Sequence, residues 1–482
     1  MEEKLNKEDK KSMGGVMSGV MGANNLKYAL PSNLSVVNSR TFQQQFADQQ
    51  SYASNSGTEL NVRLQSSQGY CYGPNSYLRL DVLATGFTSS ANLNYAVGFM
   101  KGDACALFSR FLLESKSGDE LERCEGVNLA VRNCLPWKYP NSYNGVREMA
   151  GAPVQNVAVT GLASTAIANG SLNCRQAVGG FIKTTESENA FTRLRVCIPL
   201  SYFSGIFSCE ALIPANLISG MLLRLTLANA KEALQIIASE TGYAYNVADD
   251  ANAIFTISDP VVVLDQHNLS PVIAKNLMEA SQSGLPFPYT TLYNQQSNPG
   301  TASSFVVQIN KAVSRAARIW TFSQDSDVVP SIAVDNQGTA ALAYRSVQTR
   351  IGSLYMPFQP ISIPNAASSL IDAGKNSSEL YINNLQAIDA IRPHGYHNAE
   401  PSISKNFFAE QNPDNNNNRA TLIQTLEQSA PLAYSGISIN NSRTAEQRIE
   451  YSAGKPTNQT ITSFLEYVKV ASVYPVKTVI KE

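Results

Sequence analysis

The stretch IFSCEALIPANLISGMLLRLTLANA, residues 206–230, is almost entirely apolar or small in a chain of ordinary overall hydrophobicity. A membrane-spanning helix needs roughly 20 uninterrupted apolar residues. Glu210, Pro214 and Arg224 interrupt this stretch. A charge near the bilayer centre costs at least about 2.5 kcal/mol, and a proline breaks a helix. The stretch is therefore predicted to be buried within the protein.

The second half of this stretch alternates between apolar and polar residues. Arg224 and Thr226 face one way, and the other side is formed by Leu223, Leu225 and Leu227. A period of two is typical of a half-buried strand. Pro214 and Gly220 indicate a loop before it.

The same alternation occurs on both sides of this stretch. It appears in SYLRLDV at 76–82 and RLRVCIPL at 193–200. Further strands are predicted at IFTISDPVVVL, SSFVVQIN, SRAARIWTF, YRSVQTRIGSLY, GISIN, QRIEYSA and TSFLEYVKVASVY. Many short strands separated by turns predict β-sandwiches or barrels.

Two helices are predicted among the strands. The first begins with Ser270 as N-cap and Pro271 in the first turn, ends at Gly284, and has an apolar face of Ile273, Leu277 and Ala280. The second is expected at 378–392, before Pro393, with one side formed by Tyr381, Leu385 and Ile388.

The length of the chain predicts two domains. Single cores stop growing at roughly 250 to 300 residues, and this chain has 482. The turn-rich segment 280–300 divides the strands into two comparable sets, although no sequence repeat relates them. Residues 1–60 have few large apolar groups, so we expect an N-terminal arm that orders on a partner. The small-residue patch at 14–23 lies in this arm.

The charge composition argues against direct nucleic-acid binding. Charged residues make up only 16% of the chain, and 37 Lys and Arg against 38 Asp and Glu give a net charge of -1. A protein that neutralises many phosphates, or that docks on anionic lipid by charge, would be basic.

The seven cysteines suggest reduced thiols. All lie between Cys71 and Cys209, and none shows the close spacing of a zinc or redox site. The charged start MEEKLNKEDKKS lacks the apolar core of a signal peptide. We therefore expect a cytosolic or nuclear setting.

The three histidines give weak candidates for chemistry. His394 and His397 with Glu400 have the residue types of a metal site, but Pro393 and Gly395 favour a solvated loop. His267 lies near Asp265, and such a pair can mark a general base. No nucleophile motif accompanies the pair, so a polar strand end is the favoured interpretation.

Clustered carboxylates give a further candidate. A glycosidase needs two such groups, and SGDELERCEG holds Asp119, Glu120, Glu122 and Glu125. After the Ser117–Gly118 turn they are more typical of a solvated hairpin end. The polar run PDNNNN at 413–418 indicates an exposed tip, with a binding loop as the alternative.

Seven stretches, taken in order, resemble the double jelly-roll major capsid proteins of polinton-like viruses, virophages and related small DNA viruses of protists. They are NSYLRLDV, FSRFLLESKSGDELERCEGVNLAVRN, CIPLSYFSGIFSCEALIPANLISGMLLRLTLANAKEAL, NKAVSRAARIWTF, QTRIGSLYMPFQPI, SGISINNSRTAEQRIEY and SFLEYVKVASVY. The resemblance covers about residues 60–482. The matching positions are Ile198, Gly205, Phe207, Pro214, Gly220, Ser314, Arg315, Arg350, Gly352, Tyr355, Pro357 and Pro360.

The resemblance implies an all-β fold of two tandem jelly rolls, 61–285 and 286–482, with a few short helices in loops and an extended arm at 1–60. It implies a major capsid protein that forms homotrimeric, pseudo-hexameric capsomers in an icosahedral shell, beside penton and minor capsid proteins. Assembly inside the host cell, in the cytoplasm or nucleus, would follow. No catalytic, cofactor or metal residues and no sequence-specific nucleic acid are expected, and a membrane beneath the shell stays open.

The alternative is a carbohydrate-binding or carbohydrate-active β-sandwich protein, because similar folds carry those functions. Such a protein would be expected to cluster aromatic residues in its loops. Trp137 and Trp320 are far apart in the sequence. The coat subunit is therefore the favoured prediction.

Overall fold

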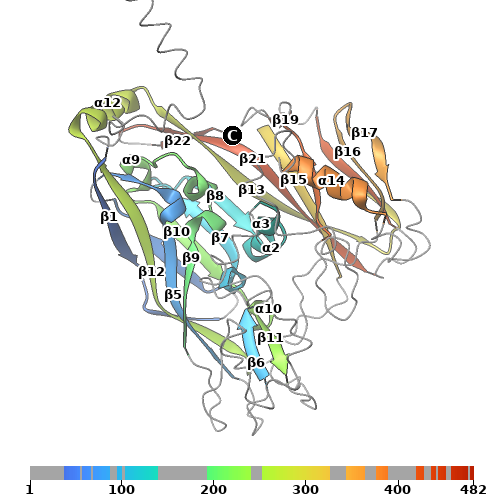
Figure 1. Cartoon of the computed structure of the whole chain (residues 1–482), viewed down its shortest axis with the longest axis horizontal. Coiled ribbons are helices and arrows are strands. Elements are labelled where there is room, and N and C mark those ends of the chain that lie inside the picture. The colour runs from blue at the N-terminus through green and yellow to red at the C-terminus, as the bar shows by residue number, and fades with distance from the viewer. Residues whose placement is uncertain are drawn as a thin grey trace, which may run out of the picture.

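The strands of the chain form two β-sandwiches that lie side by side (Figure 1). The structure is a computed structural model, and it describes residues 37–54, 57–66, 69–86, 95–99, 104–138, 193–239, 252–325, 344–363, 376–388, 420–427, 436–440, 443–451, 458–475 and 478–481. His394, His397, Glu400, the run at 413–418 and the patch at 14–23 lie outside these residues.

The first sandwich has two main antiparallel sheets. In one, β1 (Val37–Phe46), β12 (Ile254–Leu269), β5 (Tyr77–Thr85) and β9 (Leu194–Pro199) pair in that order, with β2 (Ser51–Ala53) and β4 (Tyr70–Cys71) also on β12. In the other, the order is β3 (Glu59–Arg63), β10 (Leu222–Leu227), β7 (Phe108–Glu114) and β8 (Glu120–Glu125). A separate two-stranded antiparallel sheet pairs β6 (Tyr95–Phe99) with β11 (Leu234–Ser239).

The second sandwich is built in the same way. One sheet has the order β13 (Leu285–Gly300), β21 (Gln459–Val473), β15 (Val313–Asp325) and β18 (Leu422–Thr425), with β19 (Ile437–Ile439) on β15 and β22 (Thr478–Lys481) on β21. The other has the order β14 (Ser304–Ile309), β20 (Ala445–Tyr451), β16 (Tyr344–Ile351) and β17 (Leu354–Ser362).

Both sandwiches share one strand order. When the eight principal strands of each are counted along the chain, the two sheets read 1-8-3-6 and 2-7-4-5 in both cases. This is the order of a jelly roll, a double-sheet sandwich of eight strands. The prediction of two sandwiches of like topology is confirmed, and the repeat is one of architecture without a repeat of sequence.

The apolar stretch at 206–230 provides core segments of the first sandwich. Its second half is β10, in which the three alternate leucines are buried and Arg224 faces outward to an ion pair with Glu114, 3.1 Å between Nη2 and Oε2. Gly220 has φ of 88°, which a residue with a side chain rarely adopts, and it turns the chain into β10. The strand is as predicted, and the predicted loop between Pro214 and Gly220 contains the single helical turn α9 (Ala215–Ile218).

Residues 37–54 and 57–60, which we expected to belong to the arm, are instead part of the first sandwich. Val37 pairs with Leu269 and Phe46 pairs with Val261, so β1 is the outer strand beside β12. The polar composition of β1 misled the prediction because an outer strand exposes much of its surface: most of its residues are exposed. Residues 1–36 lie outside the described part of the chain.

The two predicted helices are present, and their buried sides agree with the prediction in part. In α12 (Pro271–Gln282), which connects β12 to β13, Ile273 and Leu277 are partly buried, Ala280 is exposed and only Ser281 is buried. In α14 (Ser378–Ala387) the most buried residues are Leu380, Asn384 and Ala387, and the predicted Tyr381, Leu385 and Ile388 are partly buried and pack against the core. The Asn384 side chain donates to Thr421 O and accepts from Ile423 N, so a hydrogen-bonded amide takes the place of an apolar contact.

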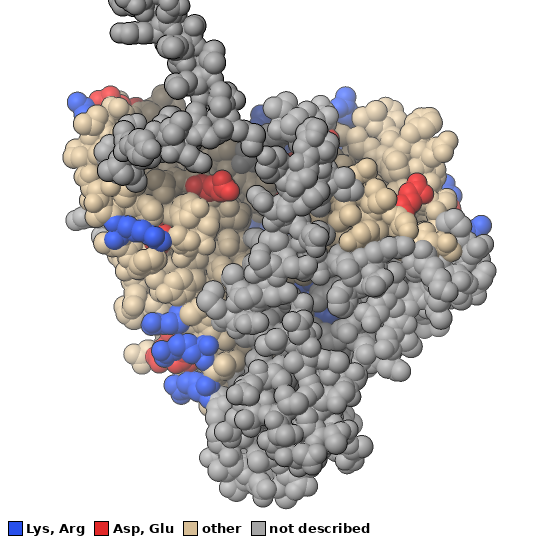
Figure 2. Space-filling view, in the orientation of Figure 1, with Lys and Arg blue, Asp and Glu red and all other residues tan. Residues whose placement is uncertain are grey.

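The surface carries few charges. Figure 2 shows mostly uncharged side chains on the described part of the face it presents, with small groups of Lys, Arg, Asp and Glu. Among the described helices, none has the length and apolar character needed to cross a bilayer.

Truncating the core of β10 tests the fold. Leu225 is fully buried, so Leu225→Ala is expected to destabilise the first sandwich by about 2 to 5 kcal/mol through lost burial and a cavity. Urea denaturation measures the change. Ile254→Ala, at an exposed position of β12, serves as the control and should change the free energy of unfolding little. Equal effects of the two substitutions would contradict the placement of β10.

Candidate functional site at the junction of the two sandwiches

Residues of β8 and of the loop after β9 form the first sandwich's side of the junction, and β13 and β21 form the other side. Tyr289 Oη on β13 donates to Leu121 O on β8 over 2.8 Å, and this bond is buried. Asn294 Nδ2 donates to Glu125 O over 2.8 Å. Two hydrogen bonds to the main chain of β8 therefore fix β13 beside it.

Gly205 allows the closest backbone contact at this junction. It begins the short helix α8 (Gly205–Ser208), and a Cβ atom built on it would lie 1.5 Å from Thr290 O on β13. No side chain fits in that space, because real Cβ atoms keep at least 3.0 Å from such an atom. The glycine at this position is therefore required by the distance between the two sandwiches.

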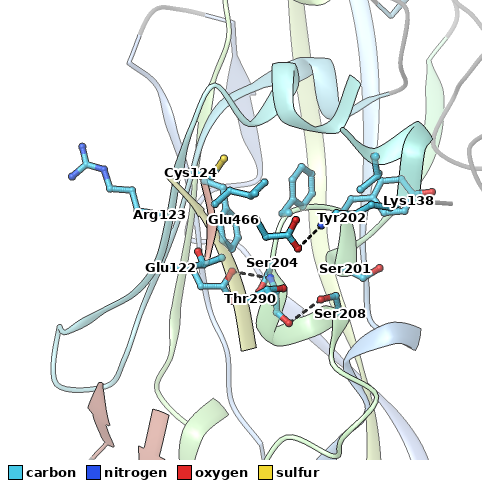
Figure 3. Close-up of a pocket in the computed structure, with 16 residues that line it drawn as sticks. Glu122, Arg123, Cys124, Lys138, Ser201, Tyr202, Ser204, Ser208, Thr290 and Glu466 are labelled. Atoms are coloured by element: carbon cyan, nitrogen blue, oxygen red, sulfur yellow. Dashed lines mark hydrogen bonds and ion pairs between the residues drawn. The ribbon is translucent and has the colours of Figure 1, made fainter. Parts of the chain in front are cut away.

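The carboxylate of Glu122 holds the loop that carries Gly205. Its Oε1 accepts from Ser204 Oγ over 2.8 Å and from Ile206 N over 2.7 Å, and its Oε2 accepts from Gly205 N over 2.8 Å (Figure 3). Burial raises the pKa of Glu122 to about 7, although these bonds and the Lys469 ammonium act in the opposite direction. Both carboxylate oxygens of this buried group have partners, which is what a buried ionisable group requires.

A second buried carboxylate, Glu466 on β21, has partners from both sandwiches. Lys138 Nζ, from α3 (Leu135–Lys138) of the first sandwich, lies 2.9 Å from its Oε1. Arg318 Nη1 lies 3.3 Å from the same oxygen, and Trp320 Nε1 donates to Oε2 over 3.0 Å. Burial would raise the pKa of Glu466, but Lys138 and Arg318 outweigh it and lower the pKa to about 2.

A cavity of about 120 Å³ lies between these groups (Figure 3). Glu122, Lys138 and Glu466 line it, together with Ser201, Tyr202, Ser204, Ser208, Thr290 and Thr291. Pockets for small-molecule ligands are larger and measure about 300 to 1,000 Å³. The arrangement is suited to joining two sandwiches and is too small to take a sugar ring between its two carboxylates.

His267 and Asp265 lie together, but the partners of Asp265 are those of a structural ion pair and differ from those of a general base. Asp265 is fully buried and accepts from Arg40 Nε and Nη2, each over 2.8 Å, and from Asn75 Nδ2 over 3.0 Å. His267 Nε2 lies 3.3 Å from Asp265 Oδ1. The nearby Ser76 Oγ donates to Tyr72 O. The carboxylate thus fastens β1 to β12 through Arg40.

Three of the four clustered carboxylates are exposed: Asp119 and Glu120 at the hairpin end that the sequence favours, and Glu125 at the other end of β8. Ser117 Oγ donates to Asp119 over 2.6 Å, and Arg123 lies 3.9 Å from Glu120 and 2.7 Å from Glu125. Glu122 is the exception, because it is buried at the junction. The sequence offers no signal for this, since Glu122 occurs among charged neighbours and its partners lie more than 80 positions away.

The twelve positions that carry the family resemblance fall into core, turn and edge sites. Ile198 and Phe207 are buried in the first core. Gly352 has φ of 59°, and its carbonyl accepts from Arg350 Nε over 2.8 Å in the turn between β16 and β17. Gly205 begins α8, and Pro214 and Gly220 lie between α8 and β10. Ser314 and Arg315 are on β15, and Tyr355, Pro357 and Pro360 are on β17. Their correspondence to positions in the family stays a prediction.

The described residues add two observations on cysteines and metals. Cys71, Cys105, Cys124, Cys134, Cys197 and Cys209 are free thiols. Burial raises the pKa of Cys71 and of Cys209 to about 12, so these two thiols hold their protons at neutral pH. No three His, Cys, Asp or Glu side chains in the described ranges gather in a way that could hold a metal ion.

The pH dependence of stability tests the environment of Glu122. The pKa of this carboxyl is raised on folding, so its contribution is fully present below its ordinary pKa of 4.5 and is lost as the pH rises through about 7. We expect this group alone to make the protein up to about 3 kcal/mol more stable at pH 5 than at pH 8. Glu122→Gln should flatten that part of the profile.

Urea denaturation at pH 5, 6.5 and 8 makes the comparison. Glu466 does not interfere, because its lowered pKa affects stability only as the pH falls from about 4.5 towards about 2. Glu120→Gln, on the exposed side of the same strand, is the control and should keep the wild-type profile. Identical profiles for wild type and Glu122→Gln would show that this carboxyl is not buried as described.

Comparison with known proteins shows a likeness in structure. No protein-family model and no curated protein matches the chain. The Faustovirus major capsid protein is similar with a TM-score of 0.58 and 9% identity over 98% of each chain. A chain of the Sputnik virophage structure has a TM-score of 0.58 and 13% identity, covering 94% of this chain and 90% of that chain.

The mavirus major capsid protein has a TM-score of 0.53 and 10% identity, covering 95% of this chain and 92% of that chain. At these identities the likeness establishes the fold. Together with the shared strand order of the two sandwiches, it shows that this chain has the double jelly-roll fold found in major capsid proteins of Faustovirus and mavirus.

Proposed function

We propose that this chain is a major capsid protein, the repeated subunit of an icosahedral virus shell. The observation that carries the proposal is the pairing of two jelly rolls of identical strand order, fixed side by side by a buried junction. The likeness to the Faustovirus major capsid protein extends over 98% of both chains and supports the proposal.

The surface and interior support an assembly role. Only 16% of the residues are charged and the net charge is -1, so wide faces can be pressed together without burying unpaired ions. The two tryptophans do not support the carbohydrate-binding alternative. Trp137 and Trp320 are both buried, so neither is available to stack on a sugar ring.

The finer assignments belong to the same proposal. The resemblance of the sequence favours the polinton-like and virophage group, with penton and minor capsid proteins as partners in the shell and assembly in the host cytoplasm or nucleus. We divide the chain near residue 285, where α12 ends and β13 begins. The first jelly roll then includes β1 and β2, and the arm is limited to residues 1–36.

The oligomer and the particle test the function. A near-hexagonal tile of six jelly rolls needs three double-barrelled chains, so the unassembled protein is expected as a homotrimer with closed three-fold symmetry. Light scattering behind a sizing column should give a mass near three times 52.2 kDa. Electron microscopy of concentrated protein should show shells or hexagonal sheets. A stable monomer at micromolar concentration, with no assembly, would exclude the proposal.

Deleting residues 1–30 tests the role of the arm. Because β1 begins at Val37, this deletion leaves every described strand intact. We expect the shortened chain to stay a folded trimer with an unchanged unfolding midpoint while the yield of shells in micrographs falls. A deletion of the same number of residues cannot be made within the sandwiches, so full-length protein is the reference. Loss of soluble protein would show that these residues serve folding.

A further inference from the structure

The outer strand β1 contributes little to the interior of the first sandwich. It lies at the edge of its sheet, beside β12 (Figure 1). Gln45 is its one buried side chain, and no residue of β1 is among the buried apolar residues of the described cores. Phe42 and Phe46 are both more than half exposed. The described apolar core of the first sandwich is therefore formed without side chains of β1.

Backbone pairing and one ion pair hold β1 in place. The strand pairs with β12 along its whole length. The Arg40 side chain forks onto Asp265, with Nε–Oδ1 and Nη2–Oδ2 distances of 2.8 Å, and two glutamine side chains of β1 form further hydrogen bonds. The Asp265 side chain is fully buried, whereas that of Arg40 is 47% exposed. These are the contacts of a strand added to a sheet edge, where backbone bonds provide affinity and a side chain provides specificity.

The ladder along this edge of β12 is broken between β1 and β2. Between the last pair of β1 and the first pair of β2, residues 47–50 stand opposite Asp259 and Pro260. Pro260 has no N–H to donate, and Asp259 has φ of 47°, in the left-handed region. The pairing of β1 is therefore separate from that of β2.

The chain beyond this break is anchored independently of β1. Tyr52 on β2 is buried in the first core, and its Oη accepts from Gln49 N over 2.9 Å. Asp48 N donates to Asn61 O on β3 over 3.0 Å. Residues 47–50 can therefore act as a hinge, with β1 on one side and a fixed chain on the other.

The partners of Asp265 other than Arg40 do not belong to β1. Asn75 Nδ2, in the 3-10 turn η3 (Gly73–Asn75), donates to its Oδ2 over 3.0 Å. The N–H of Asp265 donates to Ser76 Oγ over 3.2 Å, and His267 Nε2 lies 3.3 Å from Oδ1. If β1 left, these groups would still hold the carboxylate in place, and the vacated edge would keep a site for one arginine of an extended strand.

We propose that β1 is an exchangeable strand: residues 37–46 leave β12 as one unit about the hinge at 47–50, and the vacated edge, with Asp265 as the site for Arg40, binds the β1 of a second copy. The occupant is the same strand because the register and the fork made within one chain apply unchanged to a strand from another. Exchange of an identical element keeps every contact, so it has a low cost. The inference does not depend on the coat function.

The opposite edge of the same sheet provides a matched control. Arg195 on β9 forks onto Asp81 on β5, with distances of 2.7 and 2.9 Å, as Arg40 does onto Asp265. Unlike β1, β9 buries apolar side chains in the core, at positions 196 and 198. A similar ion pair is thus present at both edges, but β9 is expected to stay in place.

Hydrogen exchange of the full-length protein, followed by mass spectrometry at several urea concentrations below the unfolding transition, tests the release. The slowest-exchanging amides of residues 37–46 should exchange at least about tenfold faster than those of β5, with little dependence on urea, because local release exposes little surface. Asp265→Asn should speed the exchange of β1 by at least about another tenfold and leave β5 unchanged. Asp81→Asn should leave β1 unchanged. Equal rates and equal urea dependence for β1 and β5 would overturn the release.

A fluorescent peptide of residues 37–46 tests the exchange. In the full-length Arg40→Ala chain the resident β1 is weakened, so the edge is vacant more often. This chain should bind the wild-type peptide at least about tenfold more tightly than the wild-type chain does, as measured by fluorescence anisotropy. A peptide carrying Arg40→Ala should bind the same chain at least about tenfold more weakly. The full-length Asp265→Asn chain should bind the two peptides alike.

The Arg40→Ala chain keeps the test decisive if Asp265→Asn fails to fold, because Arg40 is a half-exposed side chain. Equal binding of both peptides to the Arg40→Ala chain would overturn the exchange. So would an absence of binding up to about 1 mM peptide, the range of effective concentration for a tethered strand. Either result would leave the coat function standing, because that function is tested by the trimer and by shell formation.

Discussion

The carboxylate of Glu122 fixes the loop at 204–206, and the placement of the second sandwich depends on that loop. Three donors converge on one buried side chain, two of them backbone amides that no other group in the loop satisfies. Leaving a buried donor without a partner costs about 1 to 3 kcal/mol, so the loop is held in one conformation. Gly205 then lies against Thr290 O, where no larger residue fits.

The ion pair between Lys138 and Glu466 is a second connection between the two sandwiches, and it is made by charged side chains. The Glu466 side chain is buried, whereas that of Lys138 is 32% exposed. Arg318 lies on the same carboxylate oxygen, so Glu466 would keep one cation if Lys138 were removed. The loop held by Glu122 of β8 lies against β13, and Lys138 of α3 reaches Glu466 of β21. An enzyme places buried carboxylates around open space for a substrate, whereas here their hydrogen bonds and ion pairs are used within the protein.

The strands could be predicted from sequence because their signal is local. Alternation of leucines with Arg224 and Thr226 gave β10, and RLRVCIPL gave β9. Features that depend on distant partners could not be predicted. Arg40 lies in a polar segment that resembles an arm, and its role appears only when Asp265, 225 positions later, lies beside it. Glu122 and Asn384 are polar residues buried by such partners, so a pattern of apolar residues could not place them.

The pairing of β1 with β12 has a consequence for how the chain acquires its fold. The first sandwich is complete only when residues 254–269 reach β1, so its sheet closes across more than 200 positions, and β21 closes the second sandwich onto β13 at a comparable separation. Contacts between distant positions must await chain closure, which makes folding slow. During synthesis on the ribosome, the backbone groups of β1 that pair with β12 have no partner until most of the first sandwich has been made. The polar composition of β1, which hid it from sequence analysis, keeps the strand soluble during that time.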